Sequence, residues 1–260
     1  MSTEARPRIL VLGAGFAGQN VVRTLLRLLP QKQDGQIVLV DQHNFLLYTP
    51  MLTEVAGGTI DTRHVVSAIR RLSPRVVFEQ GSVDRIDLLH KQVTLTTGDS
   101  ARDVPATART LQADHLIIAL GSVTSYHHLD GVEEHSLAMK SLGDAAAIRN
   151  RAIALLEAAN AEPDAETRRA LLTFVVAGGG FSGVETMAAL NDMLRDEARY
   201  YPRLQPGDIR CVLVHPGKRL LPEVGERLAA YAQSQLQRHG VKVRLNTEVD
   251  SAGEGYVQLK

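Results

Sequence analysis

Short apolar runs alternate along this chain with stretches in which apolar residues recur at every third or fourth position. The run RILVL at residues 8–12 predicts a buried strand, and QIVLVD at residues 36–41 predicts a second one. The stretch between them carries apolar residues at helical spacing at Val21, Val22, Leu25, Leu26 and Leu29. Strands that alternate with helices in this way are typical of βαβ units and a mostly parallel sheet.

The second half of the chain repeats this order of elements. The runs LLTFVVA at residues 171–177 and IRCVLV at residues 209–214 predict strands, and a helical pattern extends from Asp144 to about Asn160. We therefore predict two domains, residues 1–143 and residues 144–260.

Two intervening segments predict other structures. Frequent turn signals between Val76 and Thr97 are typical of an antiparallel meander. The segment at residues 59–72 is amphipathic, with Asp61 as the expected N-cap of a helix. The fold class that follows is α/β, with two Rossmann-like domains that each combine a parallel sheet with an antiparallel meander.

Composition narrows the possible partners and the compartment. Of the 260 residues, 44% are hydrophobic, and the 29 Lys and Arg balance the 29 Asp and Glu, so no bulk charge favours nucleic acid. The apolar runs are too short to cross a bilayer, and the N-terminus has no pattern of a secretory signal, so we expect a cytoplasmic protein. The only cysteine, Cys211, excludes an internal disulfide and is expected to be a buried strand residue. The spacing of the histidines predicts no metal site.

The first predicted strand is followed by a glycine turn at residues 13–18, GAGFAG, and then by the predicted helix. This context makes G-x-G-x-x-G a dinucleotide-binding pattern, in which Gly13 forms a tight turn, Gly15 lets the backbone approach a pyrophosphate and Gly18 permits close packing. Phe16 and Ala17 open the helix, whose N-terminus attracts phosphate. Asp41 ends the second strand, where a carboxylate accepts hydrogen bonds from a ribose. These positions predict a site for an adenine dinucleotide, formed by Gly13, Gly15, Phe16, Ala17, Gly18 and Asp41.

The second glycine turn, GGGFSG at residues 178–183, stands in the same context. Its expected cofactor-binding residues are Gly178, Gly180, Phe181, Ser182 and Gly183. The next strand ends at His215, which cannot accept two ribose hydrogen bonds as a carboxylate does. With Lys218 and Arg219 nearby, His215 is compatible with a 2′-phosphate, but it is equally compatible with a role as a strand cap beside a solvated basic pair. NADH and NADPH are therefore the expected candidates for the second nucleotide.

Two dinucleotide sites in one chain point to electron transfer between two nucleotides. The arrangement resembles the two-dinucleotide-fold flavoproteins of the pyridine nucleotide-disulfide oxidoreductase superfamily, which bind FAD at the first turn and NAD(P)H at the second. The stretch ADHLIIALGS resembles a family strand in which Ala119 and Gly121 let the chain pass close to FAD, with Leu120 in place of the usual Thr. The stretch GSVDRID resembles the strand whose backbone, around Val83, meets the adenine.

Within this superfamily the chain is most similar to the type II NADH dehydrogenases, which are NADH:quinone oxidoreductases. HNFLLYTPMLTEVAGGTID at residues 43–61 resembles the segment under the flavin, which implies that Thr49 and Pro50 line it. GGGFSGVE resembles the nucleotide turn with its glutamate, which implies a catalytic position for Glu185 at the nicotinamide and flavin. The alternative for Glu185 is a first-turn acid that the helix dipole stabilises.

The lack of paired cysteines excludes disulfide reductases and sulfide:quinone oxidoreductases as active enzymes, which leaves hydride transfer from NAD(P)H to FAD and onward transfer to a quinone.

Family members continue past the position of Lys260, so the resemblance implies a C-terminally truncated chain: an FAD-binding domain without its return segment, and an incomplete NAD(P)H-binding domain. Peripheral membrane association is expected only for a full-length parent, on the cytoplasmic face, and a homodimer is compatible with the sequence. The alternatives are a soluble ferredoxin- or rubredoxin-type reductase and a non-catalytic nucleotide-binding fragment.

Overall fold

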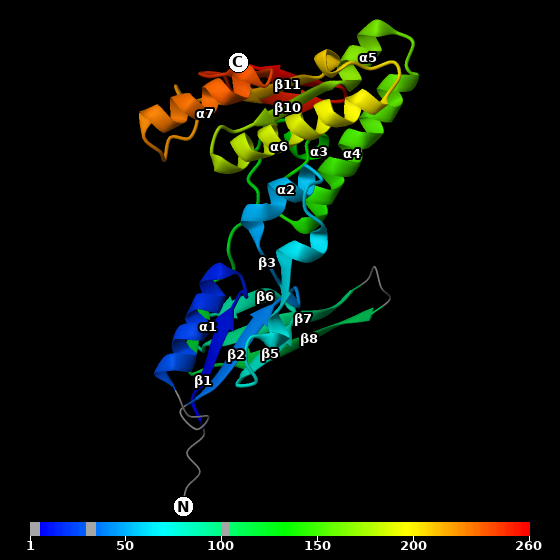
Figure 1. Cartoon of the computed structure of the whole chain (residues 1–260). Coiled ribbons are helices and arrows are strands. Elements are labelled where there is room, and N and C mark those ends of the chain that lie inside the picture. Colours follow the sequence, from blue (N-terminus) through cyan, green and yellow to red (C-terminus); the bar gives the residue numbers. More distant parts are fainter. Residues whose placement is uncertain (1–5, 30–34, 100–103) are drawn as a thin grey trace, which may run out of the picture. The chain divides into compact units, whose positions relative to one another are not determined.

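A computed structural model describes residues 6–29, 35–99 and 104–260, and these divide into two compact units (Figure 1). The first unit comprises residues 1–47 and 66–123, and the second comprises residues 48–65 and 124–260. The division at residue 143 that the sequence suggests falls inside the second unit, near the start of helix α4 (Leu142–Ala161).

The first unit is built on a four-stranded parallel sheet in the order β5-β2-β1-β9. Its strands and the helix that joins the first two are β1 (Arg8–Leu12), α1 (Phe16–Leu28), β2 (Gln36–Asp41), β5 (Val76–Gln80) and β9 (His115–Ile118). The strands and the helix predicted from the first apolar runs are confirmed. The connection from β1 through α1 to β2 places the carboxyl ends of both strands beside the first glycine turn.

Alternate residues of β1 and β2 face opposite layers, as the two-residue period of a strand requires. Ile9 and Val11 pack in a cluster with apolar residues of α1, while Leu10 and Leu12 pack with Val93. Val93 belongs to an antiparallel meander on the other face, formed by β6 (Ser82–Asp87), β7 (Gln92–Asp99) and β8 (Val104–Gln112). The sheet is thus buried on both faces, which explains why its strands read as continuous apolar runs.

Two sequence predictions are wrong in this region. Residues 76–80 form β5, a parallel strand beside β2, so the meander begins only at Ser82. Residues 59–72 form no continuous helix: a short 3₁₀ turn leads into β4 (Val66–Ala68), which pairs antiparallel with β3 (Phe45–Leu47). The Asp61 carboxylate accepts a hydrogen bond from the Arg63 N–H at 2.9 Å, but it caps this turn and not an α-helix.

The second unit contains a three-stranded parallel sheet in the order β10-β11-β12 and a separate antiparallel hairpin, β13-β14. Its strands are β10 (Thr173–Ala177), β11 (Arg210–Val214), β12 (Val241–Arg244), β13 (Val249–Gly253) and β14 (Tyr256–Leu259). Its helices are α2 (Leu52–Ala56), α3 (Val132–His135), α4, α5 (Ala165–Leu171), α6 (Phe181–Glu197) and α7 (Glu226–Arg238). Together with the first unit, this confirms the predicted α/β class with two parallel sheets.

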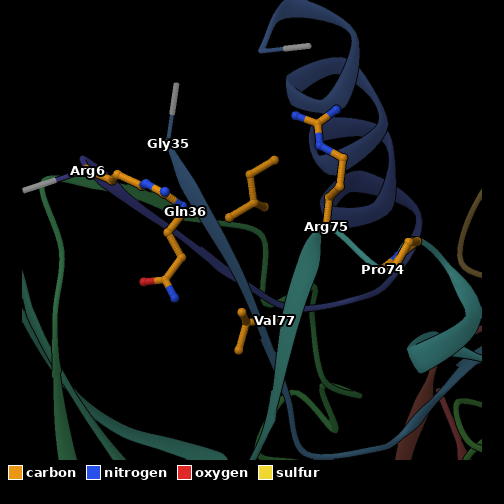
Figure 2. Close-up of a pocket in the computed structure, with 7 residues that line it drawn as sticks. Arg6, Gly35, Gln36, Pro74, Arg75 and Val77 are labelled. Atoms are coloured by element: carbon orange, nitrogen blue, oxygen red, sulfur yellow. The ribbon is translucent and has the colours of Figure 1, made fainter. Parts of the chain in front are cut away.

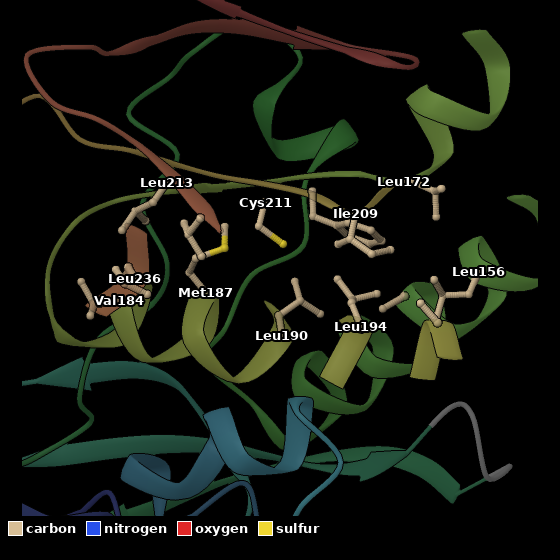
Figure 3. Close-up of a cluster of buried hydrophobic side chains, with 14 of the residues drawn as sticks. Leu156, Leu172, Val184, Met187, Leu190, Leu194, Ile209, Cys211, Leu213 and Leu236 are labelled. Atoms are coloured by element: carbon tan, nitrogen blue, oxygen red, sulfur yellow. The ribbon is translucent and has the colours of Figure 1, made fainter. Parts of the chain in front are cut away.

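The core of the second unit lies where α4 and α6 pack on the sheet (Figure 3). Leu156 of α4, Met187 of α6 and Leu213 of β11 are fully buried, and each such side chain contributes about 1.5–3 kcal/mol by leaving water. Cys211 of β11 is buried in this core, as predicted, and its burial raises the pKa of the thiol to about 11. The thiol therefore stays protonated and unreactive near neutral pH.

Helix α2 also packs in this unit, against α4 and α6. A Cβ added to Gly57, directly after α2, would lie 3.0 Å from the Cβ of Ala189 in α6, so the two elements approach closely there. None of the helices in the described parts of the chain is long and apolar enough to cross a membrane.

Candidate functional site

The glycines of the first turn each meet a different physical requirement. Gly13 has φ +96°, and a Cβ there would lie 2.2 Å from the carbonyl oxygen of Ala119 in the neighbouring strand connection. A Cβ on Gly18 would lie 1.8 Å from the Gly13 carbonyl oxygen, so the helix could not pack so close to the turn. A Cβ on Gly15, in contrast, would meet no described atom within 4 Å. The open space beside Gly15 is where a pyrophosphate would lie against the backbone.

The helices after both glycine turns begin without side-chain caps. Gly15 and Gly180 are the N-caps of α1 and α6, and among the described residues neither helix has a side-chain cap or an acid in its first turn. Two other helices of the chain are capped by their own side chains: Ser141 with Asp144 at α4, and Asp164 at α5. The positive end of the helix dipole at α1 and α6, with no acidic side chain on it, therefore suits a phosphate.

Asp41 connects the end of β2 to the first glycine turn. Its Oδ2 accepts a hydrogen bond from the Ala14 N–H at 2.7 Å, and its Oδ1 accepts one from the His43 N–H at 2.8 Å. These bonds fix the carboxylate at the carboxyl end of the sheet. This is the position that the sequence predicted for a ribose-binding acid, and the structure brings Asp41, Gly13, Gly15, Gly18 and Ala119 together in one unit.

The second glycine turn repeats the geometry of the first. Gly178 has φ +115°, and a Cβ on Gly183 would lie 1.9 Å from the Gly178 carbonyl oxygen. A Cβ on Gly180 would again point into space free of described atoms. The turn lies on the wall of a cavity of about 800 Å³ within the second unit, which Gly180, Phe181 and Ser182 line. This volume is within the range of small-molecule and cofactor pockets.

His215 occupies the place in the second turn that Asp41 occupies in the first. Its Nδ1 accepts a hydrogen bond from the Gly179 N–H at 3.1 Å, and it directly follows the end of β11. Arg219 lies in the following loop, where its guanidinium donates to the Pro222 carbonyl at 3.0 Å and lies 3.8 Å from the Glu226 carboxylate. The sequence identified both residues but did not show the bond between His215 and the turn.

Glu185 lies in α6 beyond its first turn, so the alternative of a first-turn acid is wrong. Partial desolvation, followed by the charge of Glu54 in α2, raises the pKa of the Glu185 carboxyl above its ordinary value. The close approach of Gly57 to Ala189 explains this pairing, because Glu54 and Glu185 each lie about one helical turn before those contact residues. Sequence analysis missed Glu54, although it lies in the segment identified around Thr49.

The remaining predicted residues are divided between the units. Val83 lies in β6 at a register shift and packs against the core of the first unit, and Gly121, with φ +78°, follows β9. Thr49 and Pro50 open a short 3₁₀ helix that precedes α2 in the second unit.

A second cavity, of about 470 Å³, lies in the first unit at the amino ends of β2 and β5 (Figure 2). Its lining includes Arg6 and Arg75, but the Arg75 guanidinium donates to the main-chain carbonyls of Leu26 and Leu29 at the end of α1. Ligands of open α/β sheets bind at the carboxyl ends of the strands, so this basic lining is structural. Within the described residues, no group of three or more His, Cys, Asp or Glu could hold a metal ion.

Comparisons with known proteins find relatives of this chain. A family model described as pyridine nucleotide-disulphide oxidoreductase matches residues 7–260. The chain is 31% identical over 248 residues to the mitochondrial external alternative NAD(P)H-ubiquinone oxidoreductase B4 of Arabidopsis thaliana, covering 94% of this chain and 42% of that protein. It is 31% identical over 259 residues to the type II NADH:quinone oxidoreductase NdhA of Mycobacterium tuberculosis, covering 98% of this chain and 53% of that protein.

Among solved structures, that of Plasmodium falciparum NDH2 in complex with NADH matches with a TM-score of 0.87 at 21% identity, covering 98% of this chain and 51% of that chain. The fold and the two glycine turns define a protein with two dinucleotide-binding folds. The chain belongs to the pyridine nucleotide-disulphide oxidoreductase family. Its similarity to type II NADH:quinone oxidoreductases confirms the resemblance inferred from the sequence, and the chain spans about half the length of the curated relatives it matches.

Proposed function

We propose that this chain forms the nucleotide-binding part of an FAD-dependent NAD(P)H dehydrogenase that transfers hydride from NAD(P)H to FAD and electrons onward to a quinone. The observation that carries this proposal is the presence of two glycine turns in one chain, each at an uncapped helix with open space beside its middle glycine. Two nucleotide sites in one protein suit a reaction in which one nucleotide donates electrons and the other receives them.

The first turn is assigned to FAD. Gly13, Gly15 and Gly18, with Phe16 and Ala17 at the start of α1, would hold the pyrophosphate, and the Asp41 carboxylate would accept hydrogen bonds from the adenosine ribose. Further contacts to the FAD are proposed, from the family resemblance, for Val83, Ala119, Gly121, Thr49 and Pro50. Residues 1–143 would then form the FAD-binding domain and residues 144–260 the NAD(P)H-binding domain.

The second turn is assigned to NAD(P)H, through Gly178, Gly180, Phe181, Ser182 and Gly183, with His215 and Arg219 on the ribose side. Glu185 would position the nicotinamide against the flavin. Its carboxyl retains a proton to higher pH than an ordinary glutamate does, because desolvation and Glu54 oppose its ionisation. A bound flavin would supply the chemistry that accepts a hydride and releases electrons to a further acceptor.

The acceptor side of the proposal rests on the relatives and on the cysteine content. The printed names of the relatives include quinone or ubiquinone, and the single thiol of this chain is buried and protonated. A direct route from flavin to quinone needs no protein thiol. Peripheral membrane association at the cytoplasmic face is proposed for a full-length parent, and homodimer formation is compatible with this role.

Two other functions remain testable alternatives. A soluble ferredoxin- or rubredoxin-type reductase would use the same two nucleotides with a protein acceptor. A non-catalytic fragment would bind one or both nucleotides without electron transfer.

The test is the visible spectrum of the purified 260-residue chain after reconstitution with FAD and removal of free flavin. We expect a retained flavin band that bleaches on anaerobic addition of NADH and returns when menadione is added. Retention without bleaching, or no retention, favours the non-catalytic fragment. Bleaching that menadione does not reverse, but an oxidised ferredoxin or rubredoxin does, favours the protein reductase.

Matched variants make this test specific for each site. Gly15→Asp and Gly180→Asp both fit sterically, because a Cβ at either position meets no described atom within 4 Å, and Asp is a favourable N-cap. Each would place a carboxylate where a pyrophosphate belongs. We expect Gly15→Asp to abolish flavin retention, and Gly180→Asp to keep the flavin band but abolish bleaching, while both variants stay folded.

A further inference from the structure

We propose that His215 makes the second glycine turn accept a nucleotide with a 2′-phosphate, so that NADPH binds there about as well as NADH. This inference rests on the proposed function, because it specifies the nucleotide of the same site. The key observation is a pair of equivalent hydrogen bonds, from Ala14 N–H to Asp41 in the first unit and from Gly179 N–H to His215 in the second.

The hydrogen bond to Gly179 orients the imidazole. Because His215 Nδ1 accepts this N–H at 3.1 Å, the Nδ1 edge of the ring points at the turn. The position next to the ribose of a nucleotide on this turn therefore carries no negative charge, whereas Asp41 supplies one at the first turn.

The surrounding backbone is shaped for an imidazole. A Cβ on Gly179 would lie 2.7 Å from His215 Cγ, and a Cβ on Gly217 would lie 2.7 Å from His215 Nε2. The first turn has Ala14 at the position of Gly179, because the smaller Asp41 leaves room for a methyl group there. A side chain at position 179 or 217 would thus collide with the imidazole.

The charges around His215 favour a phosphate. Lys218 follows it in the loop, and Arg244 ends the adjacent strand β12, where its carbonyl accepts the His215 main-chain N–H at 2.8 Å. Both basic residues are exposed. Glu226 lies in the same region, but it faces Arg219 at 3.8 Å. A 2′-phosphate would therefore meet an imidazole in place of a carboxylate and two exposed cations nearby, whereas a carboxylate at position 215 would repel it.

Calorimetric titration of the full 260-residue chain with NADH and with NADPH, at one fixed ionic strength, tests this inference. We expect the two dissociation constants to agree within about tenfold. His215→Asp keeps an acceptor for the Gly179 N–H but adds a charge, and it should weaken NADPH relative to NADH by at least about tenfold. The matched control His215→Asn accepts the same bond without a charge, and it should leave the ratio unchanged.

A second pair of variants tests the cations. Arg244→Ala should weaken NADPH more than NADH, whereas Lys242→Ala, which removes the same charge earlier in β12, should leave the ratio as it is. The inference is overturned if the chain binds NADH but NADPH binds more than about 100-fold more weakly, or if His215→Asp does not change the ratio. If neither nucleotide binds to the folded chain, the assignment of the second turn in the proposed function fails as well, so the two failures are distinguishable.

Discussion

The two units place the same glycine turn against different neighbours. In the first unit, β9 pairs with the edge of β1 that faces away from β2. In the second unit the corresponding edge of β10 pairs with no strand among the described residues, and the cavity beside the second turn runs along it. The Leu172 carbonyl accepts the Arg210 N–H, and the Gly178 N–H donates to the Val214 carbonyl, so the even-numbered residues of this segment bond to β11. Main-chain groups alternate in direction along a strand, so those of Val175 lie on the free edge.

The surroundings of Gly13 and Gly178 show this difference. In the first turn the backbone after β9 comes so close that a Cβ on Gly13 would lie 2.2 Å from the Ala119 carbonyl oxygen. At Gly178 no described atom lies within 4 Å of the same point. The open sides of the two turns, beside Gly15 and Gly180, are thus alike, and the sides that face the protein differ. The repeated pattern predicts the shape of the turn better than it predicts the packing behind it.

The largest predicted effect is a difference between two alanine substitutions. Gly13→Ala combines a strained positive φ with a clash against Ala119, and it should cost the first unit about 2–5 kcal/mol of unfolding free energy. Gly178→Ala has the strain without the clash, so it should cost the second unit about 1–2 kcal/mol. Hydrogen exchange of amides in β1 and β10 measures the two effects separately. Equal costs would contradict this account of the open edge.

The second prediction compares two arginines that donate to main-chain carbonyls. Arg195 of α6 donates to Pro206, Ile209 and Gly240, and so ties the helix to the segments before β11 and β12. Arg75 donates to two carbonyls at the end of α1. Since hydrogen bonds from charged groups are the stronger ones, Arg195→Met should cost about 2–4 kcal/mol and Arg75→Met about 1–3 kcal/mol.

The measurement for this pair is the same exchange experiment, read in β11 and in α1. Arg195→Lys is the control, because it keeps the charge but cannot reach several carbonyls at once. It should recover only part of the lost stability. Full recovery by Lys would show that the charge and not the hydrogen-bond geometry stabilises the second unit.

The third prediction concerns the contact between Gly179 and His215. A Cβ at position 179 would lie 2.6 Å from Leu220 Cδ2 and 2.7 Å from His215 Cγ, so Gly179→Ala should destabilise the second unit by about 1–3 kcal/mol. Combining it with His215→Asn should recover part of this loss, since the smaller side chain leaves room. The reverse change in the first unit, Ala14→Gly, removes only a buried methyl group, for about 1 kcal/mol. Thermal unfolding of the single and double variants gives the coupling energy.

The sequence predicts an element correctly where a clear apolar pattern adjoins a glycine turn. β1 and β2 follow from their continuous apolar runs, the long helix α4 follows from the helical pattern between Asp144 and about Asn160, and both glycine turns follow from their place between strand and helix. The strand at Val76–Gln80 was misassigned, because turn signals around it resemble a meander, whereas its partner β2 lies far away in the sequence. Pairing between distant strands leaves no local signal.

The candidate site was predicted less completely for the same reason. Gly15, Asp41 and His215 could be placed because each has a fixed distance from a strand end. Glu54 could not, since its effect on Glu185 depends on a helix contact between Gly57 and Ala189 that no local pattern encodes.

The smallest predicted effect is a pH-dependent contribution to stability that α6 has and α1 lacks. Glu185 corresponds in the repeat to Asn20 of α1, which is neutral, so only the second helix carries a titrating group at this position. Desolvation and then Glu54 raise the pKa of Glu185, and a raised carboxyl pKa means that ionisation is less favourable in the folded state than in the unfolded one. The contribution of Glu185 to stability therefore falls as pH rises from its ordinary value of 4.5 through the raised pKa.

Glu54→Gln removes the nearby charge but leaves the desolvation. It should lower the pKa of Glu185 part of the way towards its ordinary value, and it should reduce the loss of stability above that pKa. Carbon-detected NMR titration of the Glu185 carboxyl measures the shift, and Glu166→Gln, in the exposed first turn of α5, is the control that should leave it unchanged. Because Glu185 is exposed on the isolated chain, water screens its interaction with Glu54, and the shift should be smaller than those of buried carboxylate pairs. A Glu185 pKa that does not respond to Glu54→Gln would mean that desolvation alone distinguishes α6 from α1 at this position.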